Sequence, residues 1–159
     1  MGLTGMSVLE LAKQLAASPR ILIAEGDLNV VVMLTRAISI YDCEIDPAST
    51  VAESVKLIEA RKYDLVFVDI TLSDGSGVSV IKSVKVKMPT TPILVMATSE
   101  DAVQIKEVLL LGIVTVMLKP FKLDELRNVL TMFKVRSLPG SNVSISTITN
   151  VSQGRVTSG

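Results

Sequence analysis

Acidic side chains and one lysine directly follow short apolar runs of this sequence. They are Glu25 and Asp27, which flank Gly26, then Asp69, and finally Lys119. A carboxylate can act as a nucleophile or hold Mg²⁺, and an ammonium group can neutralise an anion. This chemistry requires the fold to bring the residues together.

Five runs rich in Val, Ile, Leu and Met alternate with helical patterns along the chain. The runs span 20–24, 43–48, 65–69, 92–97 and 114–118, and helices are predicted over 28–41, 51–61, 78–87, 101–111 and 123–135. Apolar runs of this kind are typical of strands buried on both faces of a parallel sheet. The run 43–48 contains Pro47, which cannot donate a ladder hydrogen bond, so we expect it at the edge. The pattern predicts an α/β fold with a doubly wound parallel sheet.

The predicted sheet determines where a functional site would lie. In open parallel sheets, sites form at the carboxyl ends of the strands, near the point where strand order reverses. Glu25, Asp69 and Lys119 all follow strand ends. We therefore expect these three side chains to converge.

Composition limits the classes of function. The chain has 159 residues with 16 basic and 16 acidic side chains, so net charge gives no reason to expect nucleic-acid or membrane binding. Histidine is absent, which excludes histidine-based catalysis. Cys43 is the single cysteine, so no internal disulfide can form. Without a secretion signal or a long apolar run, we expect a cytoplasmic protein.

The two ends of the chain differ from the middle. Ser7 and Glu10 form a capping-box pattern, which predicts an amphipathic helix within residues 1–18. Residues 137–159 are rich in Ser, Thr, Asn and Gly without periodicity, which predicts a flexible tail or linker. The segment 19–136 is left as the folded domain.

This segment contains the motifs YDLVFVD at 63–69, LSDGSG at 72–77 and KPF at 119–121, and Pro92 and Gly112 fit the same register. In these motifs the segment resembles the receiver domain of two-component response regulators. The resemblance implies a flavodoxin-like (βα)5 fold with strand order 2-1-3-4-5. It also implies a signalling module and not an enzyme.

The resemblance assigns roles to individual residues. Asp69 would accept a phosphoryl group from a histidine kinase or a histidine phosphotransfer protein, and Lys119 would contact the phosphate. Mg²⁺ would be held by Asp69, by the backbone carbonyl of Thr71 and by an acidic pair after the first strand. The alternative for Asp69 and Lys119 is a buried ion pair without a function.

The acidic pair departs from the pattern of the family. Glu25 takes the first acidic position, but Gly26 takes the second, which is the direct metal ligand in the family. Mg²⁺ binding is therefore expected to be weak or absent. Asp27 lies one residue later and could bind the metal if the loop moves. We expect it to cap the helix that begins at residue 28, because no other residue supplies a cap.

Two further departures affect the switch of the family. Ala97 stands where a hydroxyl usually contacts the phosphate, and Thr98 is the nearest hydroxyl that could replace it. Val116 stands where an aromatic side chain usually moves on activation. With Gly26, these positions make the switch degenerate, so we expect phosphate on Asp69 to change the surface little.

An apolar surface is predicted on the fourth helix. If Ala102, Ile105 and Leu109 face the sheet, Val103 and Leu110 point outward near Val116. We expect the fourth helix, fifth strand and fifth helix to form an interaction face, for a homodimer or a partner. The alternative is that the helical phase differs by one residue and these side chains belong to the core.

Three functional hypotheses remain. The first is a receiver that accepts phosphate on Asp69, and the second is an atypical pseudo-receiver that acts as an interaction or dimerisation module without phosphate. The third is a flavodoxin-like domain that binds a nucleotide or flavin. Glu25 and Asp27 disfavour the third hypothesis, because carboxylates after the first strand repel phosphate unless a cation intervenes.

Overall fold

A computed structural model describes residues 5, 7–9, 11, 18–113 and 115–136 of the chain. The predicted tail over 137–159 lies outside the described residues, and so does most of the predicted helix within 1–18. In the described part of that helix, the Leu11 amide donates to the Ser7 carbonyl at 3.0 Å, which is helical spacing. The proposed division into helix, domain and tail therefore stays a prediction.

A five-stranded parallel sheet forms the centre of the fold. Its strands are β1 (Arg20–Ala24), β2 (Glu44–Ala48), β3 (Leu65–Asp69), β6 (Ile93–Ala97) and β7 (Val116–Leu118). They lie in the order β2-β1-β3-β6-β7 and are all parallel. This is the order 2-1-3-4-5 of a flavodoxin-like fold, so the predicted fold class is confirmed. The strand that contains Pro47 lies at the edge, as expected.

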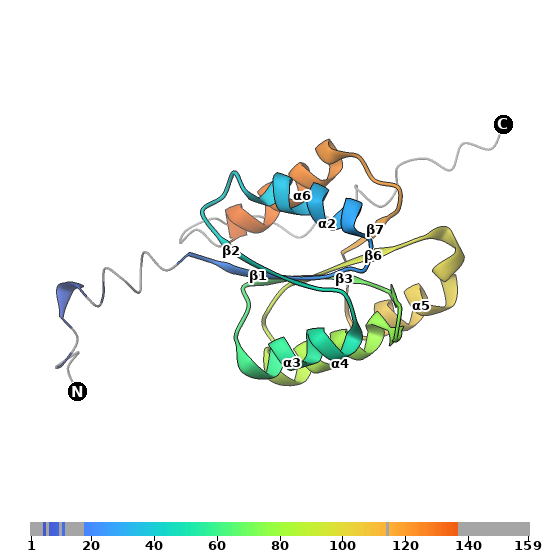
Figure 1. Cartoon of the computed structure of the whole chain (residues 1–159), viewed down its shortest axis with the longest axis horizontal. Helices are drawn as coiled ribbons and strands as arrows, with labels where there is room; N and C mark the ends of the chain where they lie inside the picture. Colours follow the sequence, from blue (N-terminus) through green and yellow to red (C-terminus); the bar gives the residue numbers. More distant parts are fainter. Residues whose placement is uncertain (1–4, 6, 10, 12–17, 114, 137–159) are drawn as a thin grey trace.

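Helices cover both faces of the sheet (Figure 1). One face carries α2 (Leu28–Ile38) and α6 (Leu123–Arg136), and the other carries α3 (Val51–Ala60), α4 (Gly77–Lys87) and α5 (Ala102–Leu110). A short 3₁₀ helix, η1 (Ser99–Asp101), leads into α5. No helix within the described ranges is long and apolar enough to cross a membrane.

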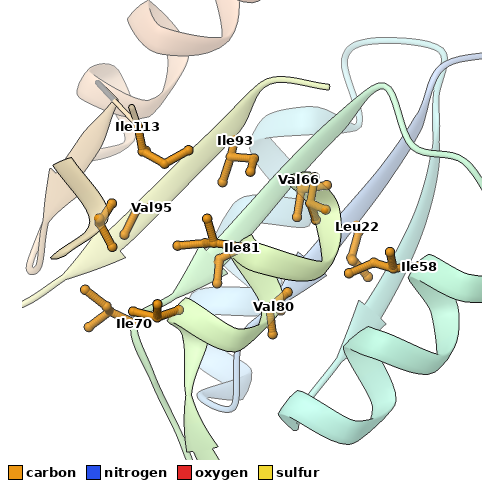
Figure 2. Close-up of a cluster of buried hydrophobic side chains, with 14 of the residues drawn as sticks. Leu22, Ile58, Val66, Ile70, Val80, Ile81, Ile93, Val95 and Ile113 are labelled. Carbon is orange, nitrogen blue, oxygen red and sulfur yellow. The ribbon is translucent and has the colours of Figure 1, made fainter. Parts of the chain in front are cut away.

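Two hydrophobic cores hold these layers together. Figure 2 shows the core between the sheet and α3 to α5, in which Leu22 and Val66 of the strands lie with Ile58 and Ile81 of the helices. The second core, between the sheet and α2 and α6, includes the fully buried Phe67. Alternate residues of each strand enter opposite cores, so the strands are fixed from both sides. The carboxyl ends of the strands are thereby held in place.

The loop after β3 contains a hairpin that the sequence analysis did not predict. It consists of β4 (Thr71–Leu72) and β5 (Gly75–Ser76), which pair antiparallel. The Ser76 hydroxyl then accepts the Val78 amide at 3.2 Å and caps α4. The hairpin places a short, hydrogen-bonded structure directly beside Asp69.

Candidate phosphoacceptor site

Asp69 ends the central strand β3, which pairs with β1 on one side and β6 on the other. Helix α4 begins very close to it, because the Gly77 amide donates to the Ile70 carbonyl at 2.8 Å. A Cβ atom at Gly77 would overlap the Asp69 carbonyl oxygen. Glycine at this position therefore allows the start of α4 to lie against the backbone of Asp69.

Lys119 follows β7 and reaches back across the sheet to two carboxylates. Its backbone amide donates to the Ala97 carbonyl at 2.7 Å, which fixes the residue beside β6. Its Nζ lies 2.6 Å from Oε2 of Glu25 and 2.7 Å from Oδ2 of Asp69. The side chains of Lys119, Glu25 and Asp69 are 19%, 1% and 12% exposed. The structure thus brings together the three residues that the strand-end argument groups.

Burial and charge act in opposite directions on this trio. Burial raises the pKa of Glu25 above its ordinary value, although the hydrogen bonds from Lys119 and the Asp27 amide partly offset the effect. Burial alone would lower the pKa of Lys119, but its hydrogen bonds to Asp69 and Glu25 outweigh burial and raise it. One ammonium group therefore serves two carboxylates, and the trio keeps one net negative charge when all three groups are ionised.

The remaining carboxylate oxygens also accept hydrogen bonds. Oε1 of Glu25 accepts the Asp27 amide at 2.8 Å, and Oδ1 of Asp69 accepts the Thr71 amide at 3.0 Å. All four oxygens of the two carboxylates thus have donors. These bonds hold both carboxylates in fixed orientations, which favours a directed reaction at Asp69.

The loop after β1 contains Gly26 and the helix cap Asp27. The backbone of Gly26 is not in the left-handed region, and a Cβ atom there would meet only the Ser49 carbonyl oxygen at 3.5 Å. Neither conformation nor space requires glycine at this position. Oδ1 of Asp27 accepts the Asn29 amide at 2.9 Å and caps α2, so the predicted cap is confirmed.

The site formed by Glu25, Asp69 and Lys119 fits Mg²⁺ only in part. Asp69 and Glu25 offer carboxylate oxygens, which are suitable ligands for this ion. Within the ranges that the structure describes, no group of three or more His, Cys, Asp and Glu side chains is arranged to hold a metal. Lys119 already contacts both carboxylates. A metal ion would have to compete with this ammonium group without help from a carboxylate at Gly26.

Ala97, Thr98 and Val116 stand at or beside the predicted switch positions. Ala97 is fully buried at the end of β6 and carries no hydroxyl. Thr98 is exposed, and its hydroxyl donates to Oδ2 of Asp101 at 3.0 Å. Its role as a phosphate contact stays a prediction. Val116 pairs with Val95 in the sheet and is half-buried against the core.

Asp101 is a residue of this region that the sequence analysis missed. Its Oδ2 accepts the Thr98 amide at 2.7 Å, and its Oδ1 accepts the Thr71 hydroxyl at 3.2 Å. The hydrogen bond from the Thr98 amide is the main cause that lowers the pKa of Asp101, and the charge of Lys119 adds to it. The capping-box spacing from Thr98 to Asp101 was the signal that could have identified it.

Helix α5 carries the predicted exposed residues, but part of the predicted phase was wrong. Val103 and Leu110 are each 81% exposed, so they do not belong to the core. Ala102 and Leu109 were expected to face the sheet and are exposed, whereas Val108 is fully buried and Ile105 is half-buried. Ile105 and Val108 are three residues apart and share one face of α5, whereas Leu109 lies one position, about 100°, further round the helix and outside the buried face.

Comparison with known proteins gives a consistent result. The sequence model of the response regulator receiver domain family matches residues 21–131. The transcriptional regulatory protein CitT of Bacillus subtilis is 29% identical over 116 residues, which cover 72% of this chain and 51% of CitT. The sensory transduction protein LytR of Staphylococcus haemolyticus is 33% identical over 90 residues, which cover 57% of this chain and 34% of LytR.

A solved structure agrees at the level of the fold. The REC domain of AraT, a response regulator from Geobacillus stearothermophilus, has a TM-score of 0.67 at 21% identity, covering 74% of this chain and 94% of that domain. The chain spans about half or less of the curated relatives CitT and LytR. Because the family model matches most of the described domain, this chain belongs to the response regulator receiver domain family of two-component signalling.

Proposed function

We propose that this receiver accepts a phosphoryl group on Asp69 from a histidine kinase or a histidine phosphotransfer protein and signals through protein contacts. The observation that carries the proposal is the Lys119 ammonium group, 2.7 Å from Oδ2 of Asp69 at the end of the central strand. A phosphoryl group arriving at Asp69 would place its oxygens beside this cation.

The proposed reaction is an in-line displacement at phosphorus. A carboxylate oxygen of Asp69 forms the new O–P bond, and the P–N bond of the partner's phosphohistidine breaks. The imidazole nitrogen of the partner keeps the electron pair. Lys119 would neutralise the charge on the phosphoryl oxygens, and the Thr71 amide would hold the other carboxylate oxygen.

We propose that Mg²⁺, when bound, is held weakly by Asp69, the Thr71 carbonyl and Glu25, and adds charge neutralisation at the phosphate. Asp27 could join only if it releases the Asn29 amide that it caps. The weak binding follows from the missing carboxylate at Gly26 and from competition by Lys119.

Intact-mass measurement tests the proposal. Wild-type protein treated with acetyl phosphate and Mg²⁺ should gain the mass of one phosphoryl group, and Asp69→Asn should gain none. Lys119→Ala should gain it more slowly, since the neutralising charge is lost. A wild-type protein without added mass at saturating donor and metal would contradict the proposal.

The second candidate function is an interaction module that works without phosphate. It is favoured by the absence of a hydroxyl at Ala97 and of an aromatic side chain at Val116, since a ligand shifts an equilibrium only through contacts that differ between two states. The ion pairs of Lys119 would then serve stability alone. The mass measurement separates the two candidates.

The proposed signalling surface is the face that carries Val103, Leu110 and Val116. Two of these side chains are largely exposed on α5, and apolar exposure of this kind marks contact sites. We propose that a second copy of the chain or a partner binds here, in the cytoplasm. Direct binding of nucleic acid is not proposed, because the basic and acidic residues balance.

A further inference from the structure

The β4–β5 hairpin is attached to helices on both of its sides. Near the acceptor, the Thr71 hydroxyl donates to Oδ1 of Asp101 at 3.2 Å, just before α5. At the turn, the carboxylate of Asp74 accepts the Val51 and Ala52 amides at 2.7 and 3.1 Å and so caps the start of α3. Asp101, which lies outside the hairpin, and Asp74, which lies in its turn, thus fix the segment that follows Asp69.

Only one of these attachments leads directly to the acceptor. The backbone amide of Thr71 donates to Oδ1 of Asp69 at 3.0 Å, and the hydroxyl of the same residue is held by Asp101. The position of this amide, and with it the orientation of the acceptor carboxylate, depends on how Thr71 is held. The amides that Asp74 binds belong to α3 and make no contact with Asp69.

Asp101 is well suited to hold Thr71. Its second oxygen, Oδ2, accepts both the amide and the hydroxyl of Thr98, at 2.7 and 3.0 Å. Both oxygens of the Asp101 carboxylate are thus engaged, Oδ1 by the Thr71 hydroxyl and Oδ2 by Thr98. Charge-assisted hydrogen bonds are stronger than neutral ones, which makes Asp101 a firm link between the hairpin and the segment that follows Ala97.

We propose that Asp101 is a positioning residue for the phosphoacceptor. Asp101 holds Thr71, and Thr71 orients Oδ1 of Asp69. The same link connects Asp69 to the start of α5, although Ala97 offers no hydroxyl for such a connection. This role rests on the proposed phosphorylation of Asp69. The link ends in η1 and the first turn of α5, and Val116 provides no aromatic side chain to extend it. The effect is therefore expected to stay local.

Four variants separate positioning from general stability. Thr71→Val removes the hydroxyl at nearly constant volume and keeps the amide that binds Asp69, while Thr71→Ser keeps the hydroxyl. Asp101→Asn removes the charge. Asp74→Asn is the matched control, because it weakens the attachment of the hairpin to α3. Each protein is first shown to be folded by urea unfolding, and its phosphorylation rate by acetyl phosphate with Mg²⁺ is then followed by intact mass.

Thr71→Val and Asp101→Asn should slow phosphorylation by a similar factor, at least about threefold, because the acceptor is oriented less well. The double variant should be no slower than the slower single variant, since both changes act on the same hydrogen bond between Thr71 and Asp101. Thr71→Ser should stay within about twofold of wild type, and Asp74→Asn should react at the wild-type rate. Phosphorylation of wild type should also alter amide hydrogen exchange over residues 98–105, and Thr71→Val should abolish that change.

Three results would overturn the positioning role. They are a wild-type rate for Thr71→Val, a Thr71→Ser variant as slow as Thr71→Val, and an Asp74→Asn variant as slow as Asp101→Asn. In each case the wild-type protein is phosphorylated, so the proposed function survives. A wild-type protein that gains no phosphoryl mass would instead overturn the proposed function and this role together.

Discussion

Substitution of Gly26 by aspartate tests whether one missing carboxylate limits Mg²⁺ binding. The nearest atom to a Cβ at this position is the Ser49 carbonyl oxygen at 3.5 Å, and the backbone is not left-handed. The substitution should therefore need no backbone shift. Gly26 is exposed, so the new carboxylate would be ionised without a large desolvation cost.

The size of the effect follows from charge and distance. A carboxylate about 4 Å from a doubly charged ion gains about 2 kcal/mol in a water-like dielectric. Part of this gain is lost because the ion must still compete with Lys119 for Glu25 and Asp69. We therefore expect Gly26→Asp to bind Mg²⁺ at least about tenfold more tightly than wild type, a difference of ~1.4 kcal/mol.

Isothermal titration of Mg²⁺ into both proteins measures this difference. Gly26→Asn is the control, because it adds a side chain of similar size without the charge, and its affinity should stay within about threefold of wild type. Equal affinities for wild type and Gly26→Asp would refute the reasoning. They would mean that Asp27 or another group already supplies the ligand.

The remaining predictions concern the ion pairs, the start of α4 and the surface of α5. Lys119→Met leaves Glu25 and Asp69 without their cation, so the free energy of unfolding, measured with urea at pH 7, should fall by about 3 kcal/mol. The pKa of Lys119 is raised in the folded state, so its contribution to the free energy of unfolding is fully present below its ordinary pKa of about 10.4. This contribution is lost as the pH rises through the pKa of the folded state. A difference in unfolding free energy between variant and wild type that does not shrink there would be contrary evidence. Gly77→Ala should cost about 2 kcal/mol in the same assay, because its methyl group meets the Asp69 carbonyl, and an unchanged unfolding midpoint would argue against this contact. Leu110→Glu should weaken any self-association measured by sedimentation. A phosphoryl mimic should change the self-association constant of the wild-type protein by less than about tenfold. A large shift that Asp69→Asn abolishes would show that the switch works.

The fold could be predicted from the sequence because its strands are buried on both faces. Such strands appear as short apolar runs, and parallel strands place all their carboxyl ends at one edge. That geometry was sufficient to predict that Glu25, Asp69 and Lys119 lie close together. Pro47 located the edge strand for an equally local reason, since it lacks an amide donor.

The attachments of the β4–β5 hairpin could not be predicted in the same way. Asp74 caps a helix that begins 23 residues earlier, and the Thr71 hydroxyl meets Asp101, which is 30 residues later. The choice of such partners depends on how loops lie in space and leaves no periodic pattern. The phase of α5 was predicted only in part, because apolar residues lie on both the buried and the exposed side of this helix and its pattern does not single out one face.

The most direct test of the central claim is to locate the phosphoryl group within the chain. Wild-type protein is treated with acetyl phosphate and Mg²⁺, and the acyl phosphate is trapped by borohydride reduction. The protein is then digested, and the masses of the peptides are measured by mass spectrometry. The account predicts a single modified residue, Asp69, and no modification of the Asp69→Asn variant. Modification at Glu25, Asp27 or Asp101 in place of Asp69, or no modification of the wild-type protein, would contradict it.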